Sequence, residues 1–287
     1  MNRAAGVFAT PLGRISATIV ATYVLAAALA PVLAPYGPEA GDLAQRLAPP
    51  SAQHWFGTDS LGRDILTRTL YGARVSLLVG ILTVAITAAF GTVVGAVGGF
   101  YRGAFDAVVG RVTELLLAFP YLIFAIGMMA FLGPGFANLV AALSLKGWVE
   151  FYRLARGETL DQGQREYVEA SRALGQKRPR TLFREVLPNV LPAISVLSTL
   201  RIGYFMVLEA SLSFLGVGIP PNIPAWGSMI SEGRGVLFIA WWVSTIPGIA
   251  LLVLVLAINL LGESLQEVYA PRNKRRGFAR PAVGKVR

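Results

Sequence analysis

The sequence contains no cysteine and a single histidine, His54. The lack of cysteine excludes disulfides, thiolate metal sites and cysteine catalysis, and one histidine cannot form a histidine-rich metal site within the chain. Charge is also scarce, because Asp, Glu, Lys and Arg make up 15% of the 287 residues, whereas a soluble domain carries about 25%. These absences argue against a soluble enzyme and direct attention to the apolar majority of the chain.

Hydrophobic residues form 54% of the sequence and occur in long runs. A membrane-spanning helix needs about 20 predominantly apolar residues. The runs that come near this length are Ile15–Leu33, Val75–Phe100, Leu115–Leu132, Phe136–Leu154, Leu191–Leu215 and Trp241–Leu261. They are continuous rather than alternating, which favours helices over a transmembrane barrel. We predict an all-α integral membrane protein with six transmembrane helices.

The first run follows Arg3 and Arg14, as the apolar region of a signal peptide would. It spans 15–33, however, and the apolar region of a signal peptide has about 7–15 residues. We therefore expect an uncleaved first span.

The basic residues, which give a net charge of +10, gather in alternate connections between the runs. In cytoplasmic connections Lys and Arg are in excess, so their distribution sets the orientation. The dense groups are in residues 153–184 and 272–287, whereas the connections 34–74 and 216–240 hold few uncompensated basic residues. This predicts a multi-pass protein of the bacterial inner (plasma) membrane with both termini cytoplasmic, and it explains the charge without a nucleic-acid partner.

The chain divides into three predicted regions. Residues 1–74 hold the N-terminus, the first span and an extracytoplasmic segment whose residues Leu61, Ile65, Leu66 and Leu70 predict an amphipathic helix on the outer surface. Residues 75–270 form the five-helix transmembrane domain, with a tight outside turn at 133–135 and a partly re-entrant outside loop at 216–235. Residues 271–287 are a basic cytoplasmic tail that anchors near anionic lipid.

The polar connection at about 157–189 is too patterned for a passive link. Tyr167, Ala170, Ser171 and Leu174 recur at helical spacing on one face. Gly175 suits a left-handed residue that ends this helix, Pro179 suits the first turn of a second short helix, and Pro188 should break the chain before the fifth span. Such a stripe predicts either docking to a protein partner or binding to the membrane surface.

The same connection resembles the EAA loop of permease subunits in ATP-binding-cassette importers. The resemblance is carried by Glu169, Ala170, Gly175, Leu187 and Pro188; the motif's second Ala is Ser171 here, and an aliphatic position is Glu185. Residues 54–64, 71–77, 209–216 and 224–227 are similar to the C-type permease of the dipeptide/oligopeptide/nickel importer group. The resemblance covers roughly residues 15–272.

The resemblance implies a type I importer permease fold in which this loop is a coupling helix. Its implied coupling residues are Glu169, Ala170, Ser171, Leu174, Gly175, Leu187 and Pro188. The implied partners are a second permease subunit, two ATP-binding-cassette ATPase subunits and an extracytoplasmic solute-binding protein. The chain has no GxxxxGK[ST] stretch, so we expect it to be no enzyme, to bind no cofactor and to rely on its partners for ATP hydrolysis.

Lys146, Glu150 and Glu209 are charged residues that lie inside predicted spans. A charge at mid-bilayer costs about 2.5–3.5 kcal/mol on insertion scales, so such residues usually face the bundle interior or a water-filled cavity. They are therefore candidates for the translocation path. Alternatively, Lys146 and Glu150 neutralise each other across one helical turn, and Glu209 serves helix packing.

The expected function is a permease subunit that passes peptides delivered by a solute-binding protein. The same machinery could import nickel or another small solute, although His54 is better explained as an ordinary surface residue than as a nickel ligand. An ion-coupled secondary transporter is a more remote alternative, because the chain has no evident internal repeat. A membrane enzyme is disfavoured by the absence of a nucleophile–base pair or metal cluster.

Overall fold

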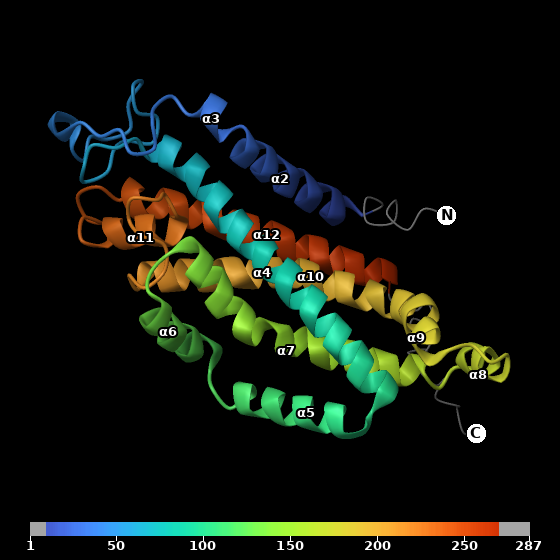
Figure 1. Cartoon of the computed structure of the whole chain (residues 1–287). Coiled ribbons are helices and arrows are strands. Elements are labelled where there is room, and N and C mark those ends of the chain that lie inside the picture. The colour runs from blue at the N-terminus through green and yellow to red at the C-terminus, as the bar shows by residue number, and fades with distance from the viewer. Residues whose placement is uncertain (1–9, 270–287) are drawn as a thin grey trace, which may run out of the picture.

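The computed structural model describes residues 10–269, which are predominantly helical (Figure 1). The basic tail 271–287 and Arg3, which contributed to the predicted orientation, lie outside the described residues. The elements are α2 (Pro11–Ala28), α3 (Ala30–Leu33), the 3-10 turn η1 (Leu43–Gln45), α4 (Ile65–Tyr101), α5 (Gly103–Leu117), α6 (Tyr121–Leu132), α7 (Phe136–Gln162), α8 (Glu166–Ala173), α9 (Arg178–Thr181), the π-helical turn η2 (Leu182–Val186), α10 (Leu187–Phe214), α11 (Trp226–Arg234) and α12 (Trp242–Tyr269).

Helix α4 is the centre of the bundle and packs along both α7 and α10. Gly91 and Gly95 of α4 lie so close to the α7 backbone, at Trp148 and Tyr152, that an added Cβ would clash. Small residues at such contacts allow helices to approach closely, which is how membrane helices gain packing energy without a hydrophobic driving force. Helix α12 packs against α10 and contacts α2, α11 and α4, while α5 and α6 lie at the edge of the bundle.

The described helices fit a membrane protein, as predicted. Four are long and apolar enough to cross a bilayer: α2, α4, the continuous helix Arg178–Phe214, and α12. The bent pair α5–α6 would bring this to five. The prediction of a multi-span helical protein is therefore confirmed, whereas the count of six spans stays a prediction. Helix α7 fills the place of the predicted fourth span.

The third predicted span, Leu115–Leu132, is not one straight helix. Helix α5 ends at Leu117, α6 begins at Tyr121, and the two axes differ in direction by 91°. Pro120 lies in the break, and the extended conformation of that residue ends the helical path. The apolar composition predicted helical structure in this segment but not the bend between its two helices.

The predicted amphipathic helix on the outer surface is also wrong. Residues from Ile65 onward belong to α4, which continues for 37 residues without interruption. The Asp64 side chain caps this helix by accepting a hydrogen bond from the Thr67 N–H at 2.8 Å. Ile65 is fully buried, so its apolar side chain serves the protein core rather than the membrane surface.

The predicted break at Pro188 is absent. Helix α9 continues through η2 into α10, and Pro188 lies in the first turn of α10. A proline has no N–H to donate, and the wider π-helical turn that precedes it accommodates the lost hydrogen bond without ending the helix. Pro179, by contrast, lies in the first turn of α9 as predicted.

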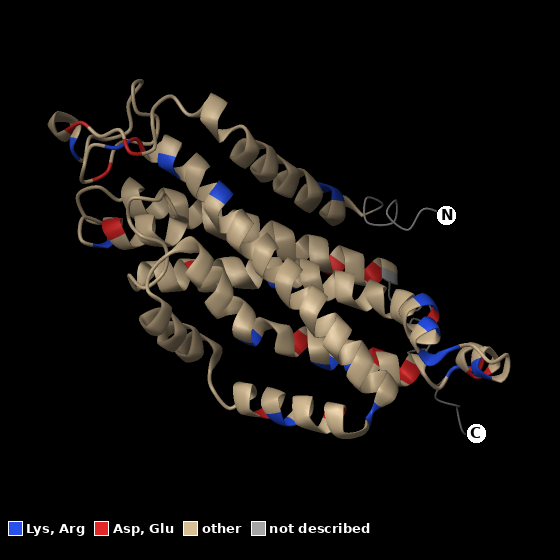
Figure 2. Cartoon of the chain, viewed as in Figure 1, with Lys and Arg blue, Asp and Glu red and all other residues tan. Residues whose placement is uncertain are grey.

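Charged side chains gather at the two ends of the bundle (Figure 2). One end carries α8 and α9, and the other carries α11 and the connection 34–64. Between them few residues are charged: α7 carries Lys146 and Glu150, α10 carries Arg201 and Glu209, and α5 at the edge of the bundle carries Asp106, Arg111 and Glu114. This distribution fits a protein whose middle lies in hydrocarbon.

Candidate functional site

The loop 157–189 forms a compact helical unit at one end of the bundle (Figure 1). Helix α8 ends with Gly175 at φ +76°, which confirms the predicted left-handed residue. The Gly175 N–H donates to the Arg172 carbonyl at 3.0 Å, and the Gln176 N–H donates to the Ser171 carbonyl at 3.1 Å. These two bonds form a Schellman motif, which satisfies the last carbonyls of α8 and turns the chain sharply toward α9.

The exposed face of α8 differs from the predicted stripe. Val168 and Ser171 are buried, and Val168 joins the main hydrophobic core together with Leu182 of η2. The residues that face away from the core include Glu169 and Leu174, whose exposed fraction is 88%. A single apolar face through Tyr167, Ala170, Ser171 and Leu174 is therefore wrong, because Ser171 lies on the inner side.

Ser171 links the two halves of the loop. Its hydroxyl lies 2.5 Å from the Gln176 amide oxygen, 3.2 Å from a Glu185 carboxylate oxygen and 3.4 Å from the Thr181 hydroxyl. An alanine, which the EAA motif has at this position, could make none of these contacts. The departure from the motif thus ties α8 to α9 and η2.

Two further contacts connect the loop with the long helices. The Arg172 guanidinium lies over the Phe100 ring of α4 at 5.5 Å from its centroid. The Tyr167 hydroxyl donates to the Gln162 side chain at 2.9 Å and accepts a bond from Asn189 of α10 at 3.4 Å. Partial burial raises the pKa of Tyr167 above its ordinary value, so this hydroxyl keeps its proton at neutral pH.

A polar cavity of about 410 Å³ lies between the loop and the end of α4. Its wall includes Glu169 and Arg172 of α8, Phe100 of α4 and Thr159 of α7. Next to it, Arg156 of α7 forms two bonds of 2.6 Å with the Asp106 carboxylate of α5. The α8 unit therefore contacts the ends of α4 and α10, and the ends of α5 and α7 are tied together beside it.

Leu187 and Pro188 begin α10 directly after η2. The helical path Arg178–Phe214 therefore runs without interruption from the α8–α9 unit into the bundle.

Lys146 lies on α7 with an exposed fraction of 5%. Its ammonium donates a hydrogen bond to the Phe119 carbonyl in the α5–α6 break, and the Tyr121 hydroxyl donates to the Leu143 carbonyl. The predicted mutual neutralisation of Lys146 and Glu150 is wrong, because Glu150 pairs with another residue.

That residue is Arg201 of α10, which lies 2.5 Å from the Glu150 carboxylate. The two side chains are 28% and 37% exposed, respectively, and the Arg201 guanidinium stacks on the Tyr204 ring at 4.9 Å. Sequence reasoning did not single out Arg201. The available signal was a lone arginine inside the apolar run Leu191–Leu215, which requires a partner at membrane depth.

Glu209 is fully buried between α4 and α10. The Ser76 hydroxyl donates to its carboxyl group at 2.8 Å and the Ser213 hydroxyl at 2.9 Å, and Ser213 also accepts a bond from the Ile219 N–H. This arrangement connects α4, α10 and the connection that follows α10. A role for Lys146, Glu150 or Glu209 in the translocation path stays a prediction.

A four-residue ionic cluster lies at the other end of the bundle. It consists of Asp59, Arg63, Arg68 and Glu232, and it joins the connection 34–64 to α4 and α11. Asp59 and Arg68 are almost completely buried. Sequence reasoning missed this cluster, since Glu232 is more than 160 positions away from its partners.

His54 is not the exposed residue that was predicted. Its side chain is 11% exposed, and its Nδ1 atom lies 2.9 Å from the Asp64 carboxylate. Within residues 10–269 no three His, Asp or Glu side chains gather closely enough to hold a metal ion.

Comparison with known proteins supports the relationship that the EAA-like loop indicated. The sequence profile of the family described as "Binding-protein-dependent transport system inner membrane component" matches residues 90–275. The profile described as "N-terminal TM domain of oligopeptide transport permease C" matches residues 8–50.

Individual relatives cover most of the chain. A Brucella abortus protein provisionally named a peptide transport system permease is 40% identical over 92% of this chain and 89% of its own length. The dipeptide transport system permease protein of Bacillus subtilis is 38% identical over 87% of this chain and 78% of its own. A glutathione transport system permease protein of Pectobacterium atrosepticum is 42% identical over 78% and 75%, respectively. The chain therefore belongs to the family of inner-membrane components of binding-protein-dependent transport systems.

Proposed function

We propose that this chain is a permease subunit of an ATP-driven importer of peptides. Family membership supports the permease role, and the relatives named for peptide, dipeptide and glutathione transport support a short peptide as the solute. The His54 Nδ1 atom lies beside the Asp64 carboxylate, so this histidine gives no support to nickel as the cargo.

The loop 157–189 is the proposed coupling element to a partner ATPase. The single observation that supports this role is the geometry of α8. A Schellman motif at Gly175 ends the helix, and Glu169, Ala170 and Leu174 are exposed at one end of the bundle. An exposed leucine beside small and charged residues suits a groove on a protein partner. Ser171 holds the unit together, and Leu187-Pro188 passes its motion to α10.

The remaining subunits follow from this assignment. A paired permease would complete the translocation path, two ATP-binding-cassette subunits would hydrolyse ATP, and an extracytoplasmic solute-binding protein would deliver the peptide. The excess of Lys and Arg in 153–184 supports a cytoplasmic position for α8 and α9. The connection 34–64 and α11 then face the opposite side, where the binding protein would dock.

The translocation path is proposed to include the charges of α7 and α10. The Glu150–Arg201 pair is partly exposed at membrane depth, and such a pair is more stable beside water or a protein partner than beside lipid. Lys146 and Glu209 are enclosed, so their proposed contribution is to hold the helices that line the path.

The decisive experiment separates ATP hydrolysis from uptake in the reconstituted assembly. Glu169→Lys and Gly175→Pro are expected to abolish peptide uptake while the chain still inserts and the ATPase subunits still hydrolyse ATP. Glu114→Lys, an exposed change on α5, is the matched control and should leave uptake intact. Uptake at the wild-type rate by both loop variants would contradict the coupling role.

Two further outcomes test the broader proposal. Mass spectrometry of the ligand that copurifies with the associated binding protein should identify a peptide. Accumulation of solute by vesicles that contain this chain alone would overturn the proposed dependence on ATPase subunits.

A further inference from the structure

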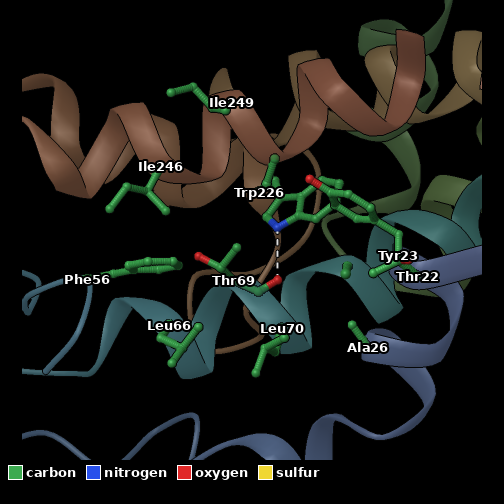
Figure 3. A pocket seen from close by; sticks show the side chains of 12 residues that line it. Thr22, Tyr23, Ala26, Phe56, Leu66, Thr69, Leu70, Trp226, Ile246 and Ile249 are labelled. Atoms are coloured by element: carbon green, nitrogen blue, oxygen red, sulfur yellow. Dashed lines mark hydrogen bonds between the residues drawn. The ribbon is translucent and has the colours of Figure 1, made fainter. Parts of the chain in front are cut away.

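An apolar cavity of about 390 Å³ opens between α2, α4 and α12 (Figure 3), toward the end of the bundle opposite the loop 157–189 (Figure 1). Its wall is formed by Thr22, Tyr23, Ala26, Phe56, Leu66, Thr69, Leu70, Ala73, Trp226, Ile246, Ile249 and Ala250. All three helices are long and apolar enough to cross a membrane. The opening of the cavity therefore faces hydrocarbon, where acyl chains are the surrounding material.

The polar groups in this wall are largely satisfied within the chain. The Trp226 indole N–H donates to the Thr69 carbonyl at 3.0 Å, as Figure 3 shows. The hydroxyls of Thr69 and Thr22 donate to the carbonyls of Ile65 and Thr18, at 2.7 and 2.9 Å. A ligand that needs several hydrogen bonds would lose them on entering, whereas an alkyl chain loses none.

The volume of the cavity favours a single acyl chain over a helix of a partner protein as the occupant. An α-helix with its side chains is about 10 Å wide and 5.4 Å per turn, so one turn alone would fill about 400 Å³. A partner helix would thus exceed the cavity after a single turn.

One end of the cavity leads toward a polar environment. Leu66 also belongs to the wall of a second cavity, of about 300 Å³, which is lined by Tyr36, Gln53 and Trp55 of the connection 34–64. Trp55 is 70% exposed, and amphipathic rings favour the depth of lipid headgroups. An occupant that is apolar along most of its length and polar at one end matches this sequence of environments.

From these observations we infer that the cavity is a binding site for one acyl chain of a membrane phospholipid. The acyl chain lies between α2 and α4 with its methyl end near Tyr23, and the lipid headgroup lies near Trp55. Helices α2 and α12 pack against each other and both contact α4, so the acyl chain fills the space that the three helices leave between them. This site is independent of the proposed transport function.

Photocrosslinking tests the site directly. The full-length chain, purified with its associated subunits, is placed in nanodiscs of phosphatidylcholine that carries a diazirine in one acyl chain, and adducts are mapped by mass spectrometry. Adducts are expected on Thr22, Leu70 and Ile249. The Ala26→Phe variant, which fills the cavity from α2, should lose them, whereas Ala21→Phe on the exposed side of α2 should retain them.

A second pair of variants guards against misfolding. Ile249 is 53% exposed, so Ile249→Trp is tolerable at that position and should block adducts on Thr22 and Leu70; Leu252→Trp, at a position with 65% exposure, is its control. Adducts spread evenly over exposed residues such as Leu252, with none in the cavity, would overturn the inference. So would unchanged adducts in both cavity variants.

Discussion

Lys146 of α7 donates a hydrogen bond to the Phe119 carbonyl, at the point where the chain turns from α5 to α6. Pro120 follows at once and provides no N–H, so the break leaves backbone groups without helical partners. The ammonium also lies 5.5 Å from the centre of the Tyr121 ring and 5.9 Å from that of Phe124. A buried charge thus stabilises the only described place where an apolar run bends by about a right angle.

Replacement of this lysine by an apolar residue of similar length should destabilise the break. Lys146→Met removes a charge-assisted hydrogen bond and two cation–π contacts, so the free energy of unfolding should fall by about 1–3 kcal/mol. Thermal unfolding of the purified assembly measures the loss. Lys177→Met, at an exposed loop position, is the control and should leave the melting temperature unchanged. Equal melting of both variants would show that the ammonium does not hold the break.

The ion pair between Glu150 and Arg201 should appear as a coupling energy. Glu150→Gln, Arg201→Gln and the double variant form a thermodynamic cycle, and we expect a coupling of about 1 kcal/mol because both side chains are partly exposed. A parallel cycle with Lys146→Gln and Glu150→Gln should give a coupling near zero, since Lys146 bonds to the Phe119 carbonyl instead. A larger coupling in the second cycle than in the first would contradict the pairing.

The ionic cluster at the opposite end predicts unequal effects for its two arginines. Arg68→Met removes an almost completely buried guanidinium that pairs with both Asp59 and Glu232, and breaking such a buried network typically costs about 3–5 kcal/mol. Arg63 pairs with the same two carboxylates, but its side chain is 9% exposed against 1% for Arg68, so Arg63→Met should cost less because water can replace part of the lost interaction. Thermal unfolding of the two variants in parallel gives the comparison. A greater loss in Arg63→Met would mean that the bridge runs through Arg63.

Much of the fold followed from local pattern. The long apolar runs predicted helices, Pro179 predicted the start of α9, and Gly175 predicted a left-handed turn, because each depends on neighbouring residues only. The bend at Pro120 was missed because the apolar composition of its run is continuous and hydropathy carries no direction.

The contacts of charged side chains could not be derived from spacing. Lys146 and Glu150 are one helical turn apart, which suggested a pair, yet Glu150 binds Arg201 from another helix. The face of α8 was mispredicted for a related reason: Val168, which is outside the predicted stripe, joins the hydrophobic core under the loop, and only Ser171 of the stripe is buried. Pairing and burial across helices depend on the packing of α7, α8 and α10, which periodicity does not encode.

Gly175 allows the conformational basis of the loop to be tested without a packing effect. Its φ of +76° is unfavourable for any residue with a Cβ, and an added Cβ would meet nothing within 4 Å. Gly175→Ala should therefore lower the stability of the loop by about 1–2 kcal/mol through backbone strain alone.

Gly157→Ala is the matched substitution, since Gly157 lies inside α7 and its Cβ would also meet nothing; there the change should stabilise the helix by about 0.5–1 kcal/mol. Hydrogen exchange of the α8 amides reports the effect of Gly175→Ala in the intact assembly, and exchange of the α7 amides reports that of Gly157→Ala. Because the strain would loosen the Schellman turn that orients α8, peptide uptake should fall in Gly175→Ala and persist in Gly157→Ala. Faster exchange in Gly175→Ala with normal uptake would show that coupling does not depend on this turn, and that other residues of the loop 157–189 provide it.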